Sequence, residues 1–265
     1  MIGLSFGSTN LHKDPSILDG KKISIYGDSI STYAGWIPEG NATYYTGTNC
    51  GVSSVYQTWW KKLIDVFRLE LVVNNSWSGR AVSSIRDTLP AHATDAGYKE
   101  SNILQLKYKN VIPDIIIIKL GINDFNSGAI LGDYDGTTEL PTNPTKFLDA
   151  YAIMLDRIMK NYPICDIYCC TLMQCERNGT SGFPEINSRG DGLGDWNIGI
   201  RKLAHAFGAK VIHHDICGIT YYNLYKYMGD YQSESGQGLH PNSYGHSLIA
   251  NQSIYDMDNA LRFRY

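Results

Sequence analysis

Short, β-branched apolar segments alternate along this chain with longer segments whose apolar residues recur at helical spacing. This alternation is typical of βα units, in which each strand is followed by a crossover helix and neighbouring strands run parallel. We therefore predict a three-layer α/β/α protein with a five-stranded parallel sheet between helices. The predicted strands are Lys22–Tyr26, Leu69–Asn74, Pro113–Leu120, Asp166–Leu172 and Lys210–His214, and the predicted helices are Val55–Phe67, Asn102–Tyr108, Pro144–Asn161, Trp196–Phe207 and Ser243–Ala260.

No internal repeat or low-complexity linker interrupts this series of strands and helices. We therefore predict a single domain over residues 1–265, in which residues 1–20 form an N-terminal extension. Two irregular stretches, Ala34–Ser54 and Gln174–Asp195, each follow a predicted strand. Loops after the carboxyl ends of strands line the ligand crevice of an open α/β sheet, so we expect both stretches to border a site.

Composition and charge argue against several classes of partner. The net charge is −3 and the Lys and Arg residues are scattered, so we expect no nucleic-acid surface. No segment approaches the roughly 20 consecutive apolar residues of a membrane-spanning helix. The first residues show no signal peptide, and the compartment and oligomeric state stay open. The six cysteines contain no Cys-x-x-Cys pair and are predicted to be free, buried thiols.

A serine follows the first predicted strand, in the segment Gly27-Asp28-Ser29. At the carboxyl end of a strand, and after a glycine that permits a tight turn, this serine would present its hydroxyl to the crevice. The same tripeptide is also an ordinary turn or helix N-cap. The segment by itself therefore leaves catalysis and a plain turn both open.

Two other strand ends carry groups that can donate hydrogen bonds. The third predicted strand runs into Gly121-Ile122-Asn123-Asp124, where the Asn123 amide is placed to donate to an oxyanion. The loop after the second strand contains Gly79, whose backbone N–H can approach the same point. Each of these segments also fits an ordinary turn.

A histidine lies just before the last predicted helix, in the segment Gly238-Leu239-His240-Pro241. The proline favours an extended conformation for His240, which places the imidazole on a loop ahead of the helix. From such a loop the side chain can reach over the edge of the sheet.

Taken together and in this order, the four segments resemble the conserved blocks of the SGNH hydrolase family, also called GDSL-type. The resemblance extends from about Lys22 to the last helix. It implies a flavodoxin-like sheet and an esterase that works through a covalent acyl-enzyme, without a metal or organic cofactor. The matched positions imply Ser29 as nucleophile, His240 as general base, and an oxyanion hole formed by the backbone N–H groups of Ser29 and Gly79 and the Asn123 amide. We also place Asp28, Trp36 and Asp124 among the substrate-binding residues.

The chain departs from the family at the acidic partner of the histidine. That residue normally lies three positions before the histidine, where this chain has Gln237. A neutral amide can orient an imidazole but cannot stabilise the imidazolium as a carboxylate does. Three possibilities follow: a Ser29–His240 dyad oriented by Gln237, a carboxylate recruited from Glu234 or Asp230, or a silent site.

The residues around the predicted site suggest a substrate class. Polar loops and the lack of a long apolar lid favour a short acyl group on a polar scaffold, so we expect acetyl or another short acyl group to be removed from a carbohydrate. Four aromatic residues fit either sugar stacking or packing against the first helix: Tyr33, Trp36, Tyr44 and Tyr45. Trp59 and Trp60 are expected to pack in the core.

The alternative is a catalytically weak or inactive SGNH-fold module that binds carbohydrate or serves as a structural part of a larger assembly. The surroundings of His240 distinguish the two. A carboxylate within hydrogen-bond reach of its Nδ1 favours the enzyme, whereas an imidazole that faces away from Ser29 favours the binding module. A nucleotide-binding protein is disfavoured, since no glycine-rich phosphate loop follows the first strand.

Overall fold

The computed structural model describes residues 17–176, 183–231 and 238–262, and within them the predicted strands form one parallel sheet. The strands are β1 Lys22–Gly27, β2 Glu70–Asn74, β3 Ile115–Lys119, β4 Asp166–Cys170 and β5 Lys210–Ile212. Their order across the sheet is β2-β1-β3-β4-β5. This is the flavodoxin-like order, so the predicted fold class is confirmed.

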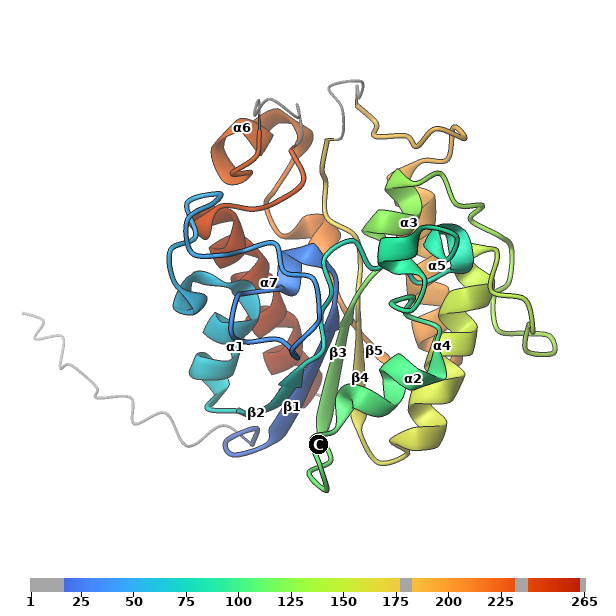
Figure 1. The fold of residues 1–265 in the computed structure, drawn as a ribbon, viewed down its shortest axis with the longest axis horizontal. Coiled ribbons are helices and arrows are strands. Elements are labelled where there is room, and N and C mark those ends of the chain that lie inside the picture. The colour runs from blue at the N-terminus through green and yellow to red at the C-terminus, as the bar shows by residue number, and fades with distance from the viewer. Residues whose placement is uncertain (1–16, 177–182, 232–237, 263–265) are drawn as a thin grey trace, which may run out of the picture.

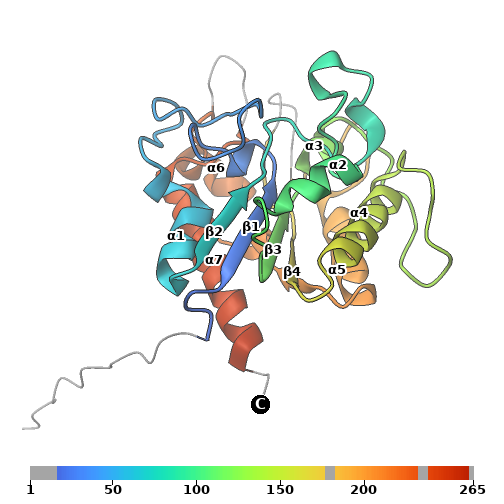
Figure 2. The same ribbon diagram turned by 60° about the horizontal axis from the view of Figure 1, so that its bottom comes forward.

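Helices cover both faces of the sheet, as a parallel sheet requires. The α-helices are α1 Trp59–Phe67, α2 Glu100–Ile103, α3 Ile122–Asn126, α4 Phe147–Asn161, α5 Leu193–Ala206, α6 Leu224–Tyr227 and α7 Ser243–Arg262. Helices α1 and α7 pack together on one face, and α2, α4 and α5 lie on the other (Figure 1). The turned view shows the same division into three layers (Figure 2).

The central strand explains why the sequence located the sheet. The four isoleucines of β3, residues 115–118, are at most 1% exposed. A strand that is covered on both faces has an uninterrupted apolar sequence instead of an alternating one. On one of these faces α1 buries Trp59 and Trp60, as expected from the sequence.

The boundaries of several predicted elements are wrong. Residues Val55–Gln57 form a separate 3-10 turn, and Thr58 is extended (φ −74°, ψ 150°), so α1 begins at Trp59 and not at Val55. The helix predicted over Asn102–Tyr108 is instead α2 followed by a 3-10 turn over Leu104–Leu106. Strands β4 and β5 each end two residues before the predicted boundary, because the chain leaves the sheet there for the loops at its edge.

Parallel strands bring their carboxyl ends to one edge of the sheet, which is uppermost in Figure 1. The turn that contains Ser29, the loop that contains Gly79 and helix α3 follow β1, β2 and β3 at this edge. The segment before α7 brings His240 to the same edge, where its side chain meets Ser29. Residues far apart in the sequence therefore converge here.

Other predictions concern the remainder of the chain. Residues 1–16 of the predicted N-terminal extension lie outside the described residues. All six cysteines are described and none is paired in a disulfide; four of them are buried, while Cys50 and Cys165 are half-buried. Within the described ranges, no helix is both long enough and apolar enough to cross a bilayer.

Candidate active site

Ser29 opens a 3-10 turn, Ser29–Ser31, directly after β1. Asp28 caps this turn, and its Oδ1 accepts a backbone N–H of the turn at 3.0 Å. A Cβ at Gly27 would lie within 2.7 Å of the side chains packed around the turn, so the tight exit from β1 requires glycine. The segment is thus a helix cap, and the same turn directs the Ser29 hydroxyl toward His240.

The side chains of Ser29, His240 and Asp230 form a continuous chain of hydrogen bonds. His240 Nε2 lies 2.9 Å from Ser29 Oγ, and His240 Nδ1 lies 2.7 Å from Asp230 Oδ2. All three side chains are buried. This is the arrangement in which a histidine can remove the proton of a serine hydroxyl while a carboxylate orients the imidazole.

Both oxygens of Asp230 have defined partners. Oδ1 accepts the backbone N–H groups of Leu239 and His240 at 3.0 and 2.9 Å, which leaves Oδ2 for the imidazole. An ionised carboxylate only accepts hydrogen bonds, so His240 donates its Nδ1–H to Asp230. The lone pair of Nε2 then faces the hydroxyl of Ser29, as a general base requires.

The acidic partner comes from a different position than in the family pattern. Asp230 lies ten residues before His240. The two segments run side by side, and the Gly229 N–H donates to the His240 carbonyl at 2.8 Å. The other candidates, Glu234 and Gln237, lie outside the described residues. Of the three residues considered from the sequence, the structure therefore brings Asp230 to the imidazole.

Two of the predicted oxyanion donors, Gly79 and Asn123, lie on segments that are hydrogen-bonded to each other. The Asn123 side-chain amide donates one hydrogen to the carbonyl of Arg80, the residue after Gly79, at 3.0 Å. The second hydrogen of this amide takes no part in that bond and can be donated to an oxyanion. Gly79 has a φ of +86°, and a Cβ there would lie 2.4 Å from the ring of His92. The N–H groups of Ser29 and Gly79 have no acceptor among the residues that the structure describes. Three donors are thus available on neighbouring segments.

Two of the predicted substrate-binding residues, Asp28 and Asp124, accept hydrogen bonds from the loops of the site. Asp124 is fully buried and accepts the backbone N–H groups of Val82 and Ser83 and the Ser83 hydroxyl, at 2.6 to 2.8 Å. Burial raises its pKa to about 6. Asp28 is only 1% exposed and caps the Ser29 turn. These carboxylates shape the loops of the site, and their contact with substrate stays a prediction. Trp36, at 40% exposed, is open to solvent.

The tyrosines that were expected either to stack on sugars or to pack have different environments. Tyr45 is fully buried and donates its hydroxyl to the Pro241 carbonyl at 2.9 Å, which holds the histidine loop. Tyr33 packs partly buried against the core. Tyr44 stacks on the imidazole of His240, with ring centroids 3.5 Å apart. The sequence shows two adjacent tyrosines before Thr46 and gives no sign of this contact.

A second histidine of the same segment, His246, is structural. Its ring is fully buried, and its Nδ1 accepts the Trp59 N–H at 3.3 Å. Burial first, and then nearby positive charge, lowers its pKa to about 3. The neutral ring is therefore part of the folded core at any pH above that value.

Because His246 is buried in its neutral form, we expect the free energy of unfolding to fall as the pH is lowered. Below pH 6.5 the unfolded chain protonates this imidazole while the folded protein does not, until the pH approaches about 3. His246→Gln, which keeps an acceptor for the Trp59 N–H, should reduce the loss of unfolding free energy between pH 7 and 5 by about 2 kcal/mol. Urea unfolding at both pH values measures this, with the exposed His205→Gln as control. Parallel losses in wild type and His246→Gln would refute it.

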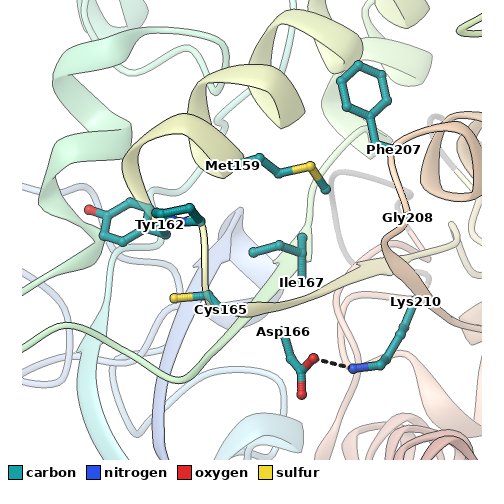
Figure 3. A pocket seen from close by; sticks show the side chains of 9 residues that line it. Met159, Tyr162, Cys165, Asp166, Ile167, Phe207, Gly208 and Lys210 are labelled. Atoms are coloured by element: carbon teal, nitrogen blue, oxygen red, sulfur yellow. Dashed lines mark hydrogen bonds and ion pairs between the residues drawn. The ribbon is translucent and has the colours of Figure 1, made fainter.

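A cavity of about 250 Å³ lies at the opposite end of the sheet, between the end of α4 and the starts of β4 and β5 (Figure 3). Two charged residues line it, Asp166 and Lys210, and they form an ion pair with each other. The Cys165 thiol beside them donates to the Pro113 carbonyl at 2.7 Å. This cavity lacks the nucleophile and base that meet at the carboxyl edge.

Comparison with known proteins gives one family match and one curated relative. The family model described as GDSL-like lipase/acylhydrolase matches residues 21–191, which is more than half of the chain and ends before Asp230 and His240. The relative is the cellulase/esterase CelE of Acetivibrio thermocellus, 25% identical over 212 residues. The match covers 72% of this chain and 23% of CelE, so the chain spans less than a quarter of that protein.

Solved structures show the same fold. A protein described as a GDSL-like lipase from Bacteroides ovatus is 26% identical, with a TM-score of 0.63 over 92% of this chain and 99% of that one. A family two carbohydrate esterase from Clostridium thermocellum, in complex with cellohexaose, is 17% identical, with a TM-score of 0.52 over 91% of this chain and 65% of that one. At that identity the second match shows the fold alone.

Proposed function

Because this chain belongs to the GDSL-like lipase/acylhydrolase family and is thus an ester hydrolase, we propose that it removes acetyl or another short acyl group from a carbohydrate. The observation that carries the proposal is the hydrogen-bonded series Ser29–His240–Asp230. The carboxylate at Nδ1 and the serine at Nε2 are the features that favour an enzyme over an inactive binding module.

The proposed reaction begins with attack of Ser29 Oγ on the ester carbonyl. His240 Nε2 takes the serine proton, and Asp230 stabilises the resulting imidazolium. The N–H groups of Ser29 and Gly79 and the Asn123 amide hold the negative oxygen of the tetrahedral intermediate. His240 then protonates the leaving alcohol, which departs and leaves the acyl group on Ser29.

The second half of the reaction releases the acyl group. Water attacks the acyl-enzyme while His240 takes one of its protons, and the oxyanion donors act again. Collapse of the second intermediate returns the proton to Ser29 and frees the carboxylic acid. Every proton transfer uses a group that lies in this chain of hydrogen bonds, so no metal or organic cofactor takes part in the proposed steps.

The carbohydrate part of the proposal is supported by the relatives and by the surface near the site. CelE is named a cellulase/esterase, and the esterase from Clostridium thermocellum was solved with cellohexaose. Trp36, in the loop that follows the Ser29 turn, is exposed, and its ring lies 6.1 Å from that of Trp60. An exposed indole held by a neighbouring ring offers a flat apolar face of the kind that sugars stack on.

A comparison of acyl groups and alcohols tests this proposal. We expect kcat/KM to be highest for p-nitrophenyl acetate and to fall by about tenfold or more for the octanoate, and we expect release of acetate from an acetylated cello-oligosaccharide. Ser29→Ala serves as the blank for spontaneous hydrolysis. A preference for octanoate, or no acetate from acetylated saccharides, would contradict the proposed substrate class.

A further inference from the structure

Tyr44 covers one face of the His240 ring. The two ring centroids are 3.5 Å apart and the ring planes differ by 12°, which is a parallel stack. Tyr45 approaches the same imidazole edge-on, at 6.4 Å and 82°. The edges of the imidazole remain free for Ser29 and Asp230, because both nitrogens point away from the stacked face.

Tyr44 is fixed from several sides. Its backbone N–H donates to Thr32 Oγ1 at 2.9 Å, and the Thr32 hydroxyl donates to the Ser29 carbonyl at 2.9 Å. The Asn49 amide donates to the Tyr44 carbonyl at 2.8 Å. The phenol and the Cys50 thiol share a hydrogen bond of 3.2 Å. The ring is therefore tied to the backbone of the proposed nucleophile.

The same loop is also packed against the segment of the acid. A Cβ at Gly229, the residue before Asp230, would lie 2.4 Å from Cys50 Cα, so the two backbones are in close contact there. Burial raises the pKa of both the Tyr44 phenol and the Cys50 thiol, so both stay neutral at ordinary pH. A neutral phenol facing the imidazole presents its electron-rich π face and no charge of its own.

We propose that Tyr44 is a positioning residue that holds the His240 imidazole by stacking and stabilises the imidazolium that forms when Ser29 loses its proton. A cation over the face of a tyrosine ring is attracted by the ring quadrupole, more strongly when both are shielded from water. The attraction grows as the proton moves to His240, so it acts on the transition state and not on substrate binding. This inference rests on the proposed function, since it requires His240 to act as the base.

The test compares Tyr44→Leu, which keeps apolar volume but removes the π face, with Tyr44→Phe, which keeps the ring and removes the hydroxyl. For p-nitrophenyl acetate we expect Tyr44→Leu to lower kcat about tenfold with KM changed by less than about twofold. Tyr44→Phe should stay within about threefold of wild type. Tyr255→Leu, at an exposed tyrosine in the second half of α7, is the matched control and should leave kcat unchanged.

A spectroscopic measurement reports directly on how firmly the imidazole is held, beside the separate effects on kcat and KM. The Nδ1–H between His240 and Asp230 should give a low-field proton NMR signal that persists in Tyr44→Phe and broadens in Tyr44→Leu as the ring gains freedom. Three results would overturn the inference. They are a wild-type kcat in Tyr44→Leu, an effect of Tyr44→Leu on KM alone, and a loss of kcat in Tyr44→Phe as large as that in Tyr44→Leu. If Ser29→Ala keeps activity, the proposed function fails instead; if it loses activity while Tyr44→Leu does not, only this inference fails.

Discussion

The substitution Ser29→Ala is expected to lower kcat/KM for p-nitrophenyl acetate by about 10⁴-fold or more. The hydroxyl is the proposed nucleophile and the group that His240 deprotonates across 2.9 Å. Loss of the nucleophile in a serine hydrolase removes the whole covalent pathway, and what remains comes from the oxyanion donors and from binding. Steady-state kinetics on the purified variant measures the effect.

His240→Ala should cause a loss of similar size, because nucleophile and base act as one unit and their effects do not add. A fluorophosphonate probe separates the two roles: it should label wild type, label His240→Ala far more slowly, and fail to label Ser29→Ala. Melting temperatures within a few degrees of wild type exclude misfolding as the cause. Labelling of another serine in Ser29→Ala, with activity retained, would show that the nucleophile lies elsewhere.

The fold was predictable because its signals are local. Burial of β3 on both faces leaves an unbroken apolar run in the sequence, and the helices between strands carry apolar residues at helical spacing. Where the α1 boundary was wrong, the cause is a single residue: Thr58 is extended, so the capped turn over Val55–Gln57 is separate from the helix. The side chains on both sides of Thr58 keep helical spacing, which hides the break.

The candidate site was predictable where function is tied to a strand end. Ser29, Gly79 and Asn123 each follow a strand of a parallel sheet, so their convergence follows from topology once the strands are known. The hydrogen bonds of the aspartates near them were not predictable: Asp28 accepts one backbone N–H through Oδ1, and Asp124 accepts two backbone N–H groups. A sequence gives a carboxylate's position along the chain but not which donors surround it.

The contact of His240 with Ser29 was predicted, but the choice of Asp230 among the candidate partners and the stack on Tyr44 were not predictable, because they depend on how two loops pack. The offset of ten residues to Asp230 is set by the pairing of Gly229 with His240, a backbone contact with no sequence signature. Tyr44 and Tyr45 are adjacent, yet one is buried beneath the loop and the other lies on the imidazole. In both cases the deciding information is long-range.

The substitution Asp230→Asn is expected to lower kcat by about 10³- to 10⁴-fold while the protein stays folded. Asp230 Oδ1 accepts two backbone N–H groups, so the amide of Asp230→Asn should turn its oxygen to them and its NH₂ to His240. An NH₂ cannot accept the Nδ1–H of the imidazole. The ring would therefore change tautomer and present an Nε2–H to Ser29, which prevents it from taking the serine proton.

Comparison with Asp230→Ala makes this prediction specific. Alanine removes the carboxylate but imposes no tautomer, so its kcat should lie above that of Asp230→Asn, even though two buried N–H groups lose their acceptor and stability falls. Asp133→Asn, at a carboxylate whose side chain is 94% exposed, is the control for a plain loss of charge. If Asp230→Asn keeps wild-type kcat while Glu234→Gln or Gln237→Ala loses it, the imidazole takes its partner from that other position during turnover, and the role given to Asp230 is wrong.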